Sequence, residues 1–485
     1  MYDVIIVGAR CGGSPTAMLT ARRGLRVLLV DKAAFPSDTI GTHFMQPRGG
    51  AYLMRWGLWN DVLASNAPSW PEHSVSREGI GPITGPNCPV KMSARFREVH
   101  GWDLDFSGRD GGLALRYTAP RRTVLDKLLV DGAVAAGAEL REETAVEGLL
   151  WDDGRVVGVR GTTRRGTPFE ARARVVVGAD GRHSRIAQQV GAQKSREEPR
   201  CTFCYWTYWE GLSLPKVIGR DSGLFLRGRL GISAFPTNDG LTHILVMGPK
   251  EWFPSFKSDI EANYQAIVDF CAPELGAALR ECRRAERIYG TIDQPQYFSV
   301  SHGPGWALVG DAGYSKDQCT AIGMTHAFRD SELLAEALHD GLAGKAASLD
   351  AALAEYQARR DRDASDYYDF VCARSKCNPP RLQELKVFAA LRGNRQLIAE
   401  YMGTAGDATH IREFYSPENL ESVLAQAKPG FPEPEILTNF EAMSASYDVD
   451  PFKSPEVLRP LAGARPAVAR PAASVVKGEV RREEV

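Results

Sequence analysis

The sequence has almost no excess charge, no long hydrophobic run and no organised set of cysteines, and each absence excludes a class of protein. The 485 residues carry a formal net charge of -1, which argues against a general binder of nucleic acid or of membrane surfaces. No uninterrupted apolar run approaches the length needed to span a bilayer. The first apolar run begins directly after Met1, so we expect no signal peptide and a cytoplasmic protein.

The nine cysteines are scattered along the chain. Cys201 and Cys204 have the C-x-x-C spacing of a redox or zinc motif, but no second pair accompanies them. They also lie in an aromatic, strand-like run. We therefore expect buried thiols in a cytosolic protein and no metal site.

Residues 2–31 follow the order strand, glycine-rich turn, helix, strand. Tyr2 to Val7 predicts a buried strand, residues 14–23 a helix and residues 25–30 a second strand. This order is typical of a dinucleotide-binding βαβ unit, in which the helix N-terminus faces a pyrophosphate.

The turn and the acid after the second strand predict an ADP-containing cofactor. The carboxylate of Asp31 can accept both hydroxyls of an adenosine ribose. Arg10 stands where the fingerprint has its second glycine, so its guanidinium either contacts phosphate or flavin or points to solvent. The predicted contacts in this unit are Gly8, Arg10, Gly12, Gly13, Asp31 and Lys32.

Three separated segments predict one discontinuous nucleotide-binding domain, made of residues 1–75, 112–192 and 296–345. Strand-like runs with turn signals between them predict a second, sheet-based domain that binds the substrate. This domain is expected to comprise residues 76–111 and 193–295.

The last part of the chain has a different pattern. Residues 346–450 have helical spacing, most clearly over residues 348–374 and 382–402. Residues 451–485 are rich in Pro, Ala, Arg and Val without periodicity, which predicts a disordered tail.

Two glycine–aspartate motifs follow the first unit. Residues 177–185 read VGADGRHSR, and residues 310–324 read GDAGYSKDQCTAIGM. With these motifs the chain resembles the group A flavoprotein monooxygenases of the para-hydroxybenzoate hydroxylase type, whose three fingerprints occur here in the same order. The resemblance covers roughly residues 1–345 and implies an α/β fold: a Rossmann-like FAD-binding domain with an inserted antiparallel β-sheet substrate domain, followed here by a helical C-terminal region.

The later motif has roles that the resemblance makes specific. Asp311, after Gly310, ends a strand, and its carboxylate can accept a hydroxyl of the flavin's ribityl chain. Gly323 and Met324 open a helix whose N–H groups would face the pyrimidine side of the flavin and stabilise negative charge there. The family's Pro-Pro pair beside the flavin is replaced by residues 317–318, Asp-Gln, so this loop is less rigid.

Four further contacts are implied by the resemblance. Arg48 matches a position that reaches phosphate or flavin, and Arg122 matches one that contacts the pyrophosphate, for which the bidentate guanidinium is well suited. The alternative for each is a solvated arginine at the start of a helix. Val146 is expected to meet the adenine through its backbone. Asp180 lies either near the flavin's phosphates and the path of a nicotinamide cofactor, or caps a helix that begins near Ser184.

The substrate side offers only weak catalytic candidates. Aromatic side chains alternate along the strand expected over residues 201–209, with Tyr205 and Trp209 on one face and the even-numbered aromatics on the other. One of these faces is expected to cover the flavin and line an aromatic pocket. His43 is either an acid or base of that pocket or a hydrogen-bonded structural residue.

The resemblance implies an FAD-dependent monooxygenase of the hydroxylase or epoxidase type. In that family NAD(P)H reduces the flavin, and O2 adds at C4a to form a hydroperoxide that oxidises an electron-rich substrate. The substrate is expected to be hydrophobic, aromatic or polyketide-like. No separate nicotinamide-binding fold is visible, so NAD(P)H would bind transiently; neither nucleic acid nor an integral membrane segment is expected.

Three alternatives stay open. The first is an FAD-dependent dehydrogenase or reductase similar to the geranylgeranyl reductases. The second is a flavin-dependent halogenase, although the chain approaches that family's Trp-x-Trp-x-Ile-Pro motif only at Trp206-x-x-Trp209. The third is a scaffold with structural, non-redox FAD.

Overall fold

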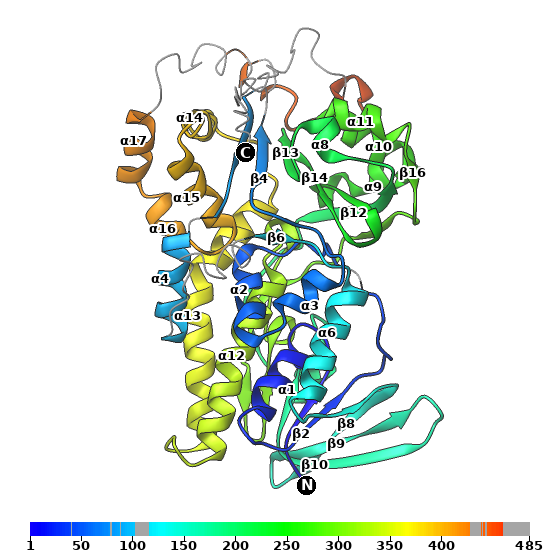
Figure 1. Cartoon of the computed structure of the whole chain (residues 1–485), viewed down its shortest axis with the longest axis vertical. Coiled ribbons are helices and arrows are strands. Elements are labelled where there is room, and N and C mark those ends of the chain that lie inside the picture. The colour runs from blue at the N-terminus through cyan, green and yellow to red at the C-terminus, as the bar shows by residue number, and fades with distance from the viewer. Residues whose placement is uncertain are drawn as a thin grey trace, which may run out of the picture.

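The computed structural model describes residues 1–39, 41–77, 80–87, 89–101, 116–426, 438, 440–441 and 444–458. Figure 1 shows one α/β layer at the bottom, a second sheet with its helices at the top right, and a column of helices along the left side. The fold class predicted above is confirmed. No helix in the described part of the chain is long and apolar enough to cross a membrane.

The first sheet has the strand order β19-β20-β10-β1-β2-β7. Its strands are β1 (Tyr2–Val7), β2 (Val27–Val30), β7 (Glu139–Arg141), β10 (Pro168–Gly178), β19 (His302–Gly303) and β20 (Trp306–Leu308). All neighbours pair in parallel except β19 and β20. A hairpin of β8 (Thr144–Asp152) and β9 (Arg155–Thr163) extends β10.

Both faces of the first sheet are covered, which is why its strands are continuous apolar runs. Val4, Ile6 and Leu29 pack on one face with the helices, and Ile5 and Leu28 pack on the other. The covering helices are α1 (Gly13–Ala21), α2 (Pro47–Trp56), α3 (Trp59–Ala64), α6 (Arg122–Ala135) and α12 (Gly323–Leu342). Helix α1 packs between α6 and α12.

The second sheet has the order β16-β12-β15-β14-β13-β4-β5, with β17 beside β12. Its strands are β4 (His73–Arg77), β5 (Gly81–Gly85), β12 (Thr202–Glu210), β13 (Gly223–Arg227), β14 (Leu230–Pro236), β15 (Thr242–Pro249), β16 (Arg283–Arg284) and β17 (Tyr289–Thr291). It is antiparallel apart from the pair of β13 and β4. The sheet therefore draws strands from both inserted segments.

One face of the second sheet is covered by helices that the sequence did not reveal. These are α8 (Leu214–Ile218), α9 (Phe253–Phe256), α10 (Ile260–Cys271) and α11 (Pro273–Leu279). Tyr264, Ile267 and Val268 of α10 are buried against the sheet. The opposite face is left to meet the first layer and the C-terminal helices.

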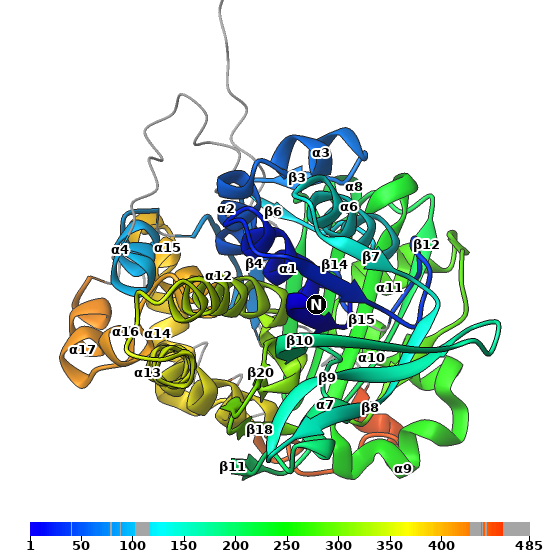
Figure 2. The same cartoon turned by 90° about the horizontal axis from the view of Figure 1, so that it is seen from below.

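The C-terminal region is helical, as expected. It contains α13 (Leu349–Ser375), α14 (Leu382–Ala390), α15 (Arg395–Ala405), α16 (Ile411–Phe414) and α17 (Pro417–Ala425). Figures 1 and 2 show α13 lying beside α12. Two helices occupy residues 382–402, because Gly393 has φ +76° and the Asn394 side chain accepts from the Leu397 N–H to start α15. Most of the predicted tail lies outside the described residues.

Candidate functional site

The three glycine-rich motifs meet at one edge of the first sheet. A Cβ atom on Gly8 would lie 2.5 Å from the Ala179 carbonyl oxygen, in the second motif. A Cβ atom on Gly310, in the third motif, would lie 3.9 Å from the Cα of Gly12. The Tyr297 hydroxyl lies 2.9 Å from the carbonyl oxygens of both Arg182 and Asp311 and so joins the second motif to the third.

Asp31 is positioned over the glycine turn. Its Oδ2 accepts a 2.7 Å hydrogen bond from the Ala9 N–H, and its Oδ1 accepts one of 2.8 Å from the Ala33 N–H. Each oxygen keeps a second lone pair for a hydroxyl. The Asp31 carbonyl accepts from the N–H of Thr144, which brings strand β8 and the buried Val146 beside it. Lys32 is exposed.

Two arginines flank the turn and share one carboxylate. Arg122 makes a bidentate pair with Asp126, from Nε to Oδ1 at 3.0 Å and from Nη2 to Oδ2 at 3.0 Å, and Arg10 donates to the same carboxylate at 2.5 Å. The Asp126 side chain has no exposed surface. Arg10 also lies over the Phe35 ring, 5.3 Å from its centroid, so it does not point to solvent. Two guanidinium groups against one carboxylate leave net positive charge beside the turn, which favours an anion.

Asp180 accepts hydrogen bonds at the start of the short helix α7 (Arg185–Gln189), whose N-cap residue is Ser184. Its carboxylate accepts from the Ser184 hydroxyl at 2.5 Å and from the Arg185 N–H at 2.7 Å. Asp180 thus supports the first turn of this helix together with the N-cap residue Ser184. Its predicted place near the phosphates is compatible with the cap, since the second motif lies against Gly8.

The third motif presents an exposed carboxylate and an open helix N-terminus. The Asp311 residue is exposed, but desolvation of its carboxyl group raises its pKa against the opposing effect of Lys316, Arg182 and Arg122. Helix α12 has no side-chain cap, and nothing lies within 4 Å of where a Cβ on Gly323 would be. The free N–H groups of its first turn, which includes Met324, are thus available to a ligand.

The Arg48 side chain is held in a buried ionic cluster with the C-terminal region. Its Nη1 donates to the Asp407 carbonyl at 3.0 Å and pairs with the Asp407 carboxylate. The cluster, which we call the five-residue cluster, consists of Arg48, Arg95, Arg329, Asp363 and Asp407. The predicted phosphate contact of Arg48 would require these bonds to break.

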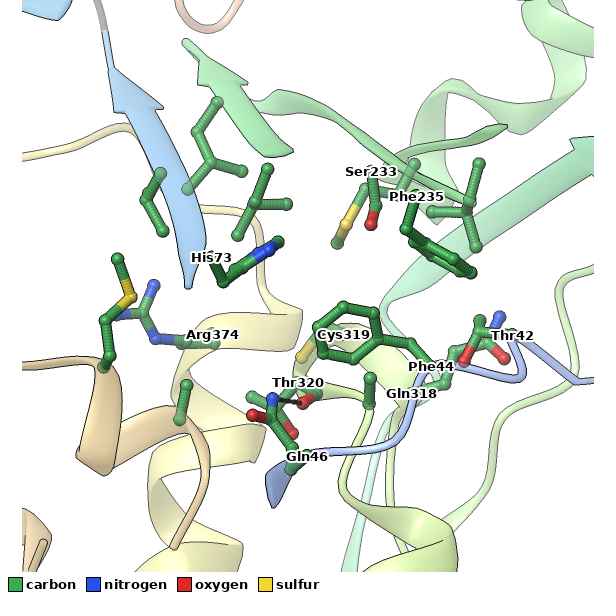
Figure 3. A pocket seen from close by; sticks show the side chains of 18 of the residues that line it. Thr42, Phe44, Gln46, His73, Ser233, Phe235, Gln318, Cys319, Thr320 and Arg374 are labelled. Carbon is green, nitrogen blue, oxygen red and sulfur yellow. Dashed lines mark hydrogen bonds between the residues drawn. The ribbon is translucent and has the colours of Figure 1, made fainter. Parts of the chain in front are cut away.

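A cavity lies between the second sheet, the loop before α12 and the C-terminal helices. It holds about 950 Å³ of empty volume, its mouth included. Gln318, Cys319, Thr320 and Ala321 line it from the third motif, so it adjoins the N-terminus of α12. Figure 3 shows Phe44, Phe235, His73, Cys319 and Thr320 around this space, with the Gln46 amide bonded to the Thr320 carbonyl.

The candidates on β12 are divided between its two faces. Cys204 lines the cavity, and Trp206 and Tyr208 pack on the same side. Tyr205 and Trp209 lie on the opposite face, in the cluster formed with α9 and α10. The even-numbered face is therefore the one that looks toward the cavity, and a substrate there would contact neither Tyr205 nor Trp209.

His43 is a buried, hydrogen-bonded residue. Its Nε2 pairs with the Tyr208 hydroxyl, and the ring of His243 lies 5.8 Å away. Burial, with His243 and two arginines adding to it, holds the pKa of His43 well below its usual value. The neighbours Thr42 and Phe44 line the cavity, while the His43 ring itself is bound to Tyr208. This geometry favours the structural alternative.

Part of the cavity wall could not be found from the sequence. Arg374 at the end of α13 and Tyr401, Met402 and Thr404 of α15 line it. These helices showed only an amphipathic pattern, which indicates packing and not a ligand. Of the paired cysteines, Cys204 is buried and Cys201 half-buried, and both are free thiols; no group of His, Cys, Asp and Glu in the described ranges could hold a metal ion.

Comparison with known proteins agrees with this geometry. Residues 1–207 match the model of the FAD binding domain, and residues 116–315 match that of FAD dependent oxidoreductases. Both matched models describe FAD-binding proteins, and together the matched ranges span residues 1–315. This flavoprotein is 24% identical over 360 residues to a digeranylgeranylglycerophospholipid reductase of Methanosarcina acetivorans, covering 74% of this chain and 80% of the relative.

Solved structures of other flavoproteins share the fold. The flavin-dependent brominase Bmp2 superposes with a TM-score of 0.68 at 19% identity, covering 92% of this flavoprotein and 99% of the brominase. PqsL, a probable FAD-dependent monooxygenase from Pseudomonas aeruginosa, gives a TM-score of 0.61 at 21% identity and covers 84% and 99%. At these sequence identities the structural similarity shows only that the chain shares their fold.

Proposed function

We propose that this flavoprotein is an FAD-dependent monooxygenase that uses NAD(P)H and O2 to oxidise a hydrophobic, aromatic or polyketide-like substrate. The observation that supports it is the cavity of largely apolar lining that adjoins residues 318–321, directly before helix α12. A substrate in this cavity would lie beside a flavin ring at that helix N-terminus. The largely apolar lining would disfavour water beside the flavin, which suits oxygen chemistry on it.

The residues present fit an extended FAD. Close backbone approach at the glycine turn and the net positive charge of the Arg10 and Arg122 pair suit the pyrophosphate. Asp31 and Val146 suit the adenosine, and Asp311 the ribityl chain. When bound, FAD supplies the redox chemistry; the chain binds and orients it. The proposed contacts are Gly8, Arg10, Gly12, Gly13, Asp31, Lys32, Arg122, Val146, Asp180, Gly310, Asp311, Gly323 and Met324.

A second candidate function is a reductase. It is favoured by the curated relatives, which carry the name digeranylgeranylglycerophospholipid reductase. A reductase would use the same FAD site and cavity, because none of the contacts proposed above is specific to oxygen chemistry. The two functions differ in what happens to the electrons that NAD(P)H delivers.

The decisive assay measures NAD(P)H oxidation and O2 uptake by the FAD-loaded protein against a panel of phenols and polyketide aromatics. We expect a substrate that accelerates flavin reduction and couples O2 uptake to an oxygenated product. Turnover under anaerobic conditions with a saturated product would contradict the monooxygenase and support the reductase. A flavin that stays oxidised with NADH and NADPH in every case would contradict both and indicate structural FAD.

Asp311→Ala should lose FAD. The exposed Asp311 carboxylate is the group placed to accept a ribityl hydroxyl, and such a charged hydrogen bond contributes roughly 1.5–3 kcal/mol, or about tenfold to hundredfold in affinity. FAD titration followed by flavin fluorescence measures the change. Asp350→Ala, at a side chain 52% exposed on α13, is the control and should bind FAD normally. An Asp311→Ala protein that purifies with full, tight flavin would refute this role.

A further inference from the structure

Arg374 is a cation in the wall of an otherwise uncharged cavity. Among the lining side chains it is accompanied by aromatic, aliphatic, thiol, hydroxyl, amide and imidazole groups, and by no carboxylate. Its guanidinium lies 4.7 Å from the centroid of the Phe370 ring, and its Nη2 donates to the Tyr415 hydroxyl at 3.4 Å. Figure 3 shows it on the opposite side of the view from Thr42.

A second guanidinium approaches the same place from the sheet. His73 and Val75 of β4 line the cavity, and side chains two positions apart share a face of a strand. Arg77 continues that face, with its guanidinium carbon 5.9 Å from the centroid of the Phe388 ring. Arg77 and Arg374 both interact with the phenol of Tyr401, which lines the cavity. We call the group formed by Arg77, Arg374 and Tyr401 the arginine end.

The charge of the arginine end is not balanced within the described ranges. No ion pair joins Arg77 or Arg374 to a carboxylate there, whereas the buried arginines of the five-residue cluster each have one. Burial alone would raise the pKa of Tyr401, but Arg374 and Arg77 outweigh it and lower the pKa below its ordinary value. An unpaired guanidinium in a desolvated site is costly and gains most from an anionic partner.

We propose that the arginine end binds a carboxylate of the substrate, so that the substrate class is a hydrophobic acid. Arg374 makes the main contact through its planar guanidinium, which matches a carboxylate in two hydrogen bonds. The apolar body of the acid then lies along Phe44, Phe235 and Leu224, next to Thr320. The inference rests on the proposed function, because it assigns the orientation of the substrate in the same cavity.

The test compares each acid with its neutral amide on the FAD-loaded, full-length protein. The probes are naphthoate with naphthamide and octanoate with octanamide, titrated by calorimetry and by the flavin difference spectrum. We expect at least one acid to bind about tenfold or more tightly than its amide, since a charge-assisted bidentate pair is lost in the amide. Equal affinity within both pairs, including no measurable binding, would overturn the proposal without any variant.

Variants assign the preference to the arginine end. Arg374→Gln should weaken binding of the acid by about tenfold to hundredfold and change the amide by less than about threefold, whereas Arg374→Lys should keep part of the preference. Arg381→Gln, at a side chain 82% exposed, is the control. An acid preference that survives in Arg374→Gln would contradict the assignment.

Tyr401→Phe excludes an internal counterion. The preference for the acid should persist in this variant, because both guanidinium groups remain. If the phenolate of Tyr401 balanced them instead, the preference would be absent from the unaltered protein and would emerge only in Tyr401→Phe, which would overturn the proposal. Flavin content and reduction by NAD(P)H, measured on the same samples, report separately on the proposed function.

Discussion

Gly13→Ala will give a protein that does not bind FAD. A Cβ atom on Gly13 would lie 1.7 Å from the Gly8 carbonyl oxygen and 2.9 Å from its carbonyl carbon. The backbone at Gly8 cannot move away from the added Cβ atom, because two hydrogen bonds hold it in the sheet. The Gly8 N–H donates to the Val30 carbonyl, and the Ala179 N–H donates to the Val7 carbonyl. Distorting the turn to make room for this Cβ atom should lower the free energy of unfolding by on the order of 3 kcal/mol or more. Flavin absorbance of the purified variant and its melting temperature measure both effects.

Gly24→Ala is the control for that experiment. Gly24 follows the same helix and has φ +84°, but nothing lies within 4 Å of its would-be Cβ. The substitution should cost about 1 kcal/mol through backbone strain alone and leave FAD bound. A Gly13→Ala protein with the flavin content of Gly24→Ala would show that the turn is not shaped as described.

Asp363→Ala will destabilise the protein strongly. Asp363 pairs with Arg95 and, at 2.8 Å, with Arg329, and lies 4.0 Å from Arg48. Removing this carboxylate leaves three buried guanidinium groups with one negative charge fewer, while Asp407 and Asp330 remain as partners, so we expect a loss of up to about 3–5 kcal/mol in the free energy of unfolding. The midpoint of urea unfolding measures the loss. Asp366→Ala on the same helix, where the side chain is 41% exposed, should cost less than about 1 kcal/mol.

The same residue predicts how stability depends on pH. Burial raises the pKa of Asp363, but Arg95 and Arg329 outweigh it and hold the pKa below its usual value. The stabilisation is therefore fully present above the unfolded-state pKa of about 4 and is lost as the pH falls below it. The gap in stability between the unaltered protein and Asp363→Ala should narrow in acid. Two results would contradict the described ion pairs of Asp363. One is a stability difference between the unaltered protein and Asp363→Ala that stays constant down to strongly acidic pH. The other is a loss of stability in Asp363→Ala no larger than that in Asp366→Ala.

The part of the site that the sequence predicted is the part set by local backbone geometry. Gly8 and Gly310 have positive φ, and Gly13 has no room for a Cβ. Such positions require glycine because of the local backbone conformation, independently of the contacts made by distant segments. The order of the glycine motifs was therefore enough to indicate the FAD-binding layer. The hydrogen bonds of Asp180 at the start of α7 are local in the same sense.

The rest depended on contacts between distant segments. Arg48 is paired by Asp363 and Asp407, which lie more than 300 residues along the chain, and nothing in the neighbouring sequence indicated them. The choice between the two faces of β12 is made by α9 and α10, which cover Tyr205. Arg374 lines the cavity only because α13 ends there. An amphipathic helical pattern indicates which residues are buried, but it does not indicate whether they pack against protein or line a cavity.

The central claim is that three remote segments together bind one extended FAD, and the most direct measurement is a crystal structure of the protein loaded with it. The account predicts one FAD per chain, with the pyrophosphate against Gly8 to Gly13, the ribityl chain at Asp311 and the flavin ring between the α12 N-terminus and the cavity. A protein that takes up no flavin, or density for flavin anywhere other than along this path, would contradict it.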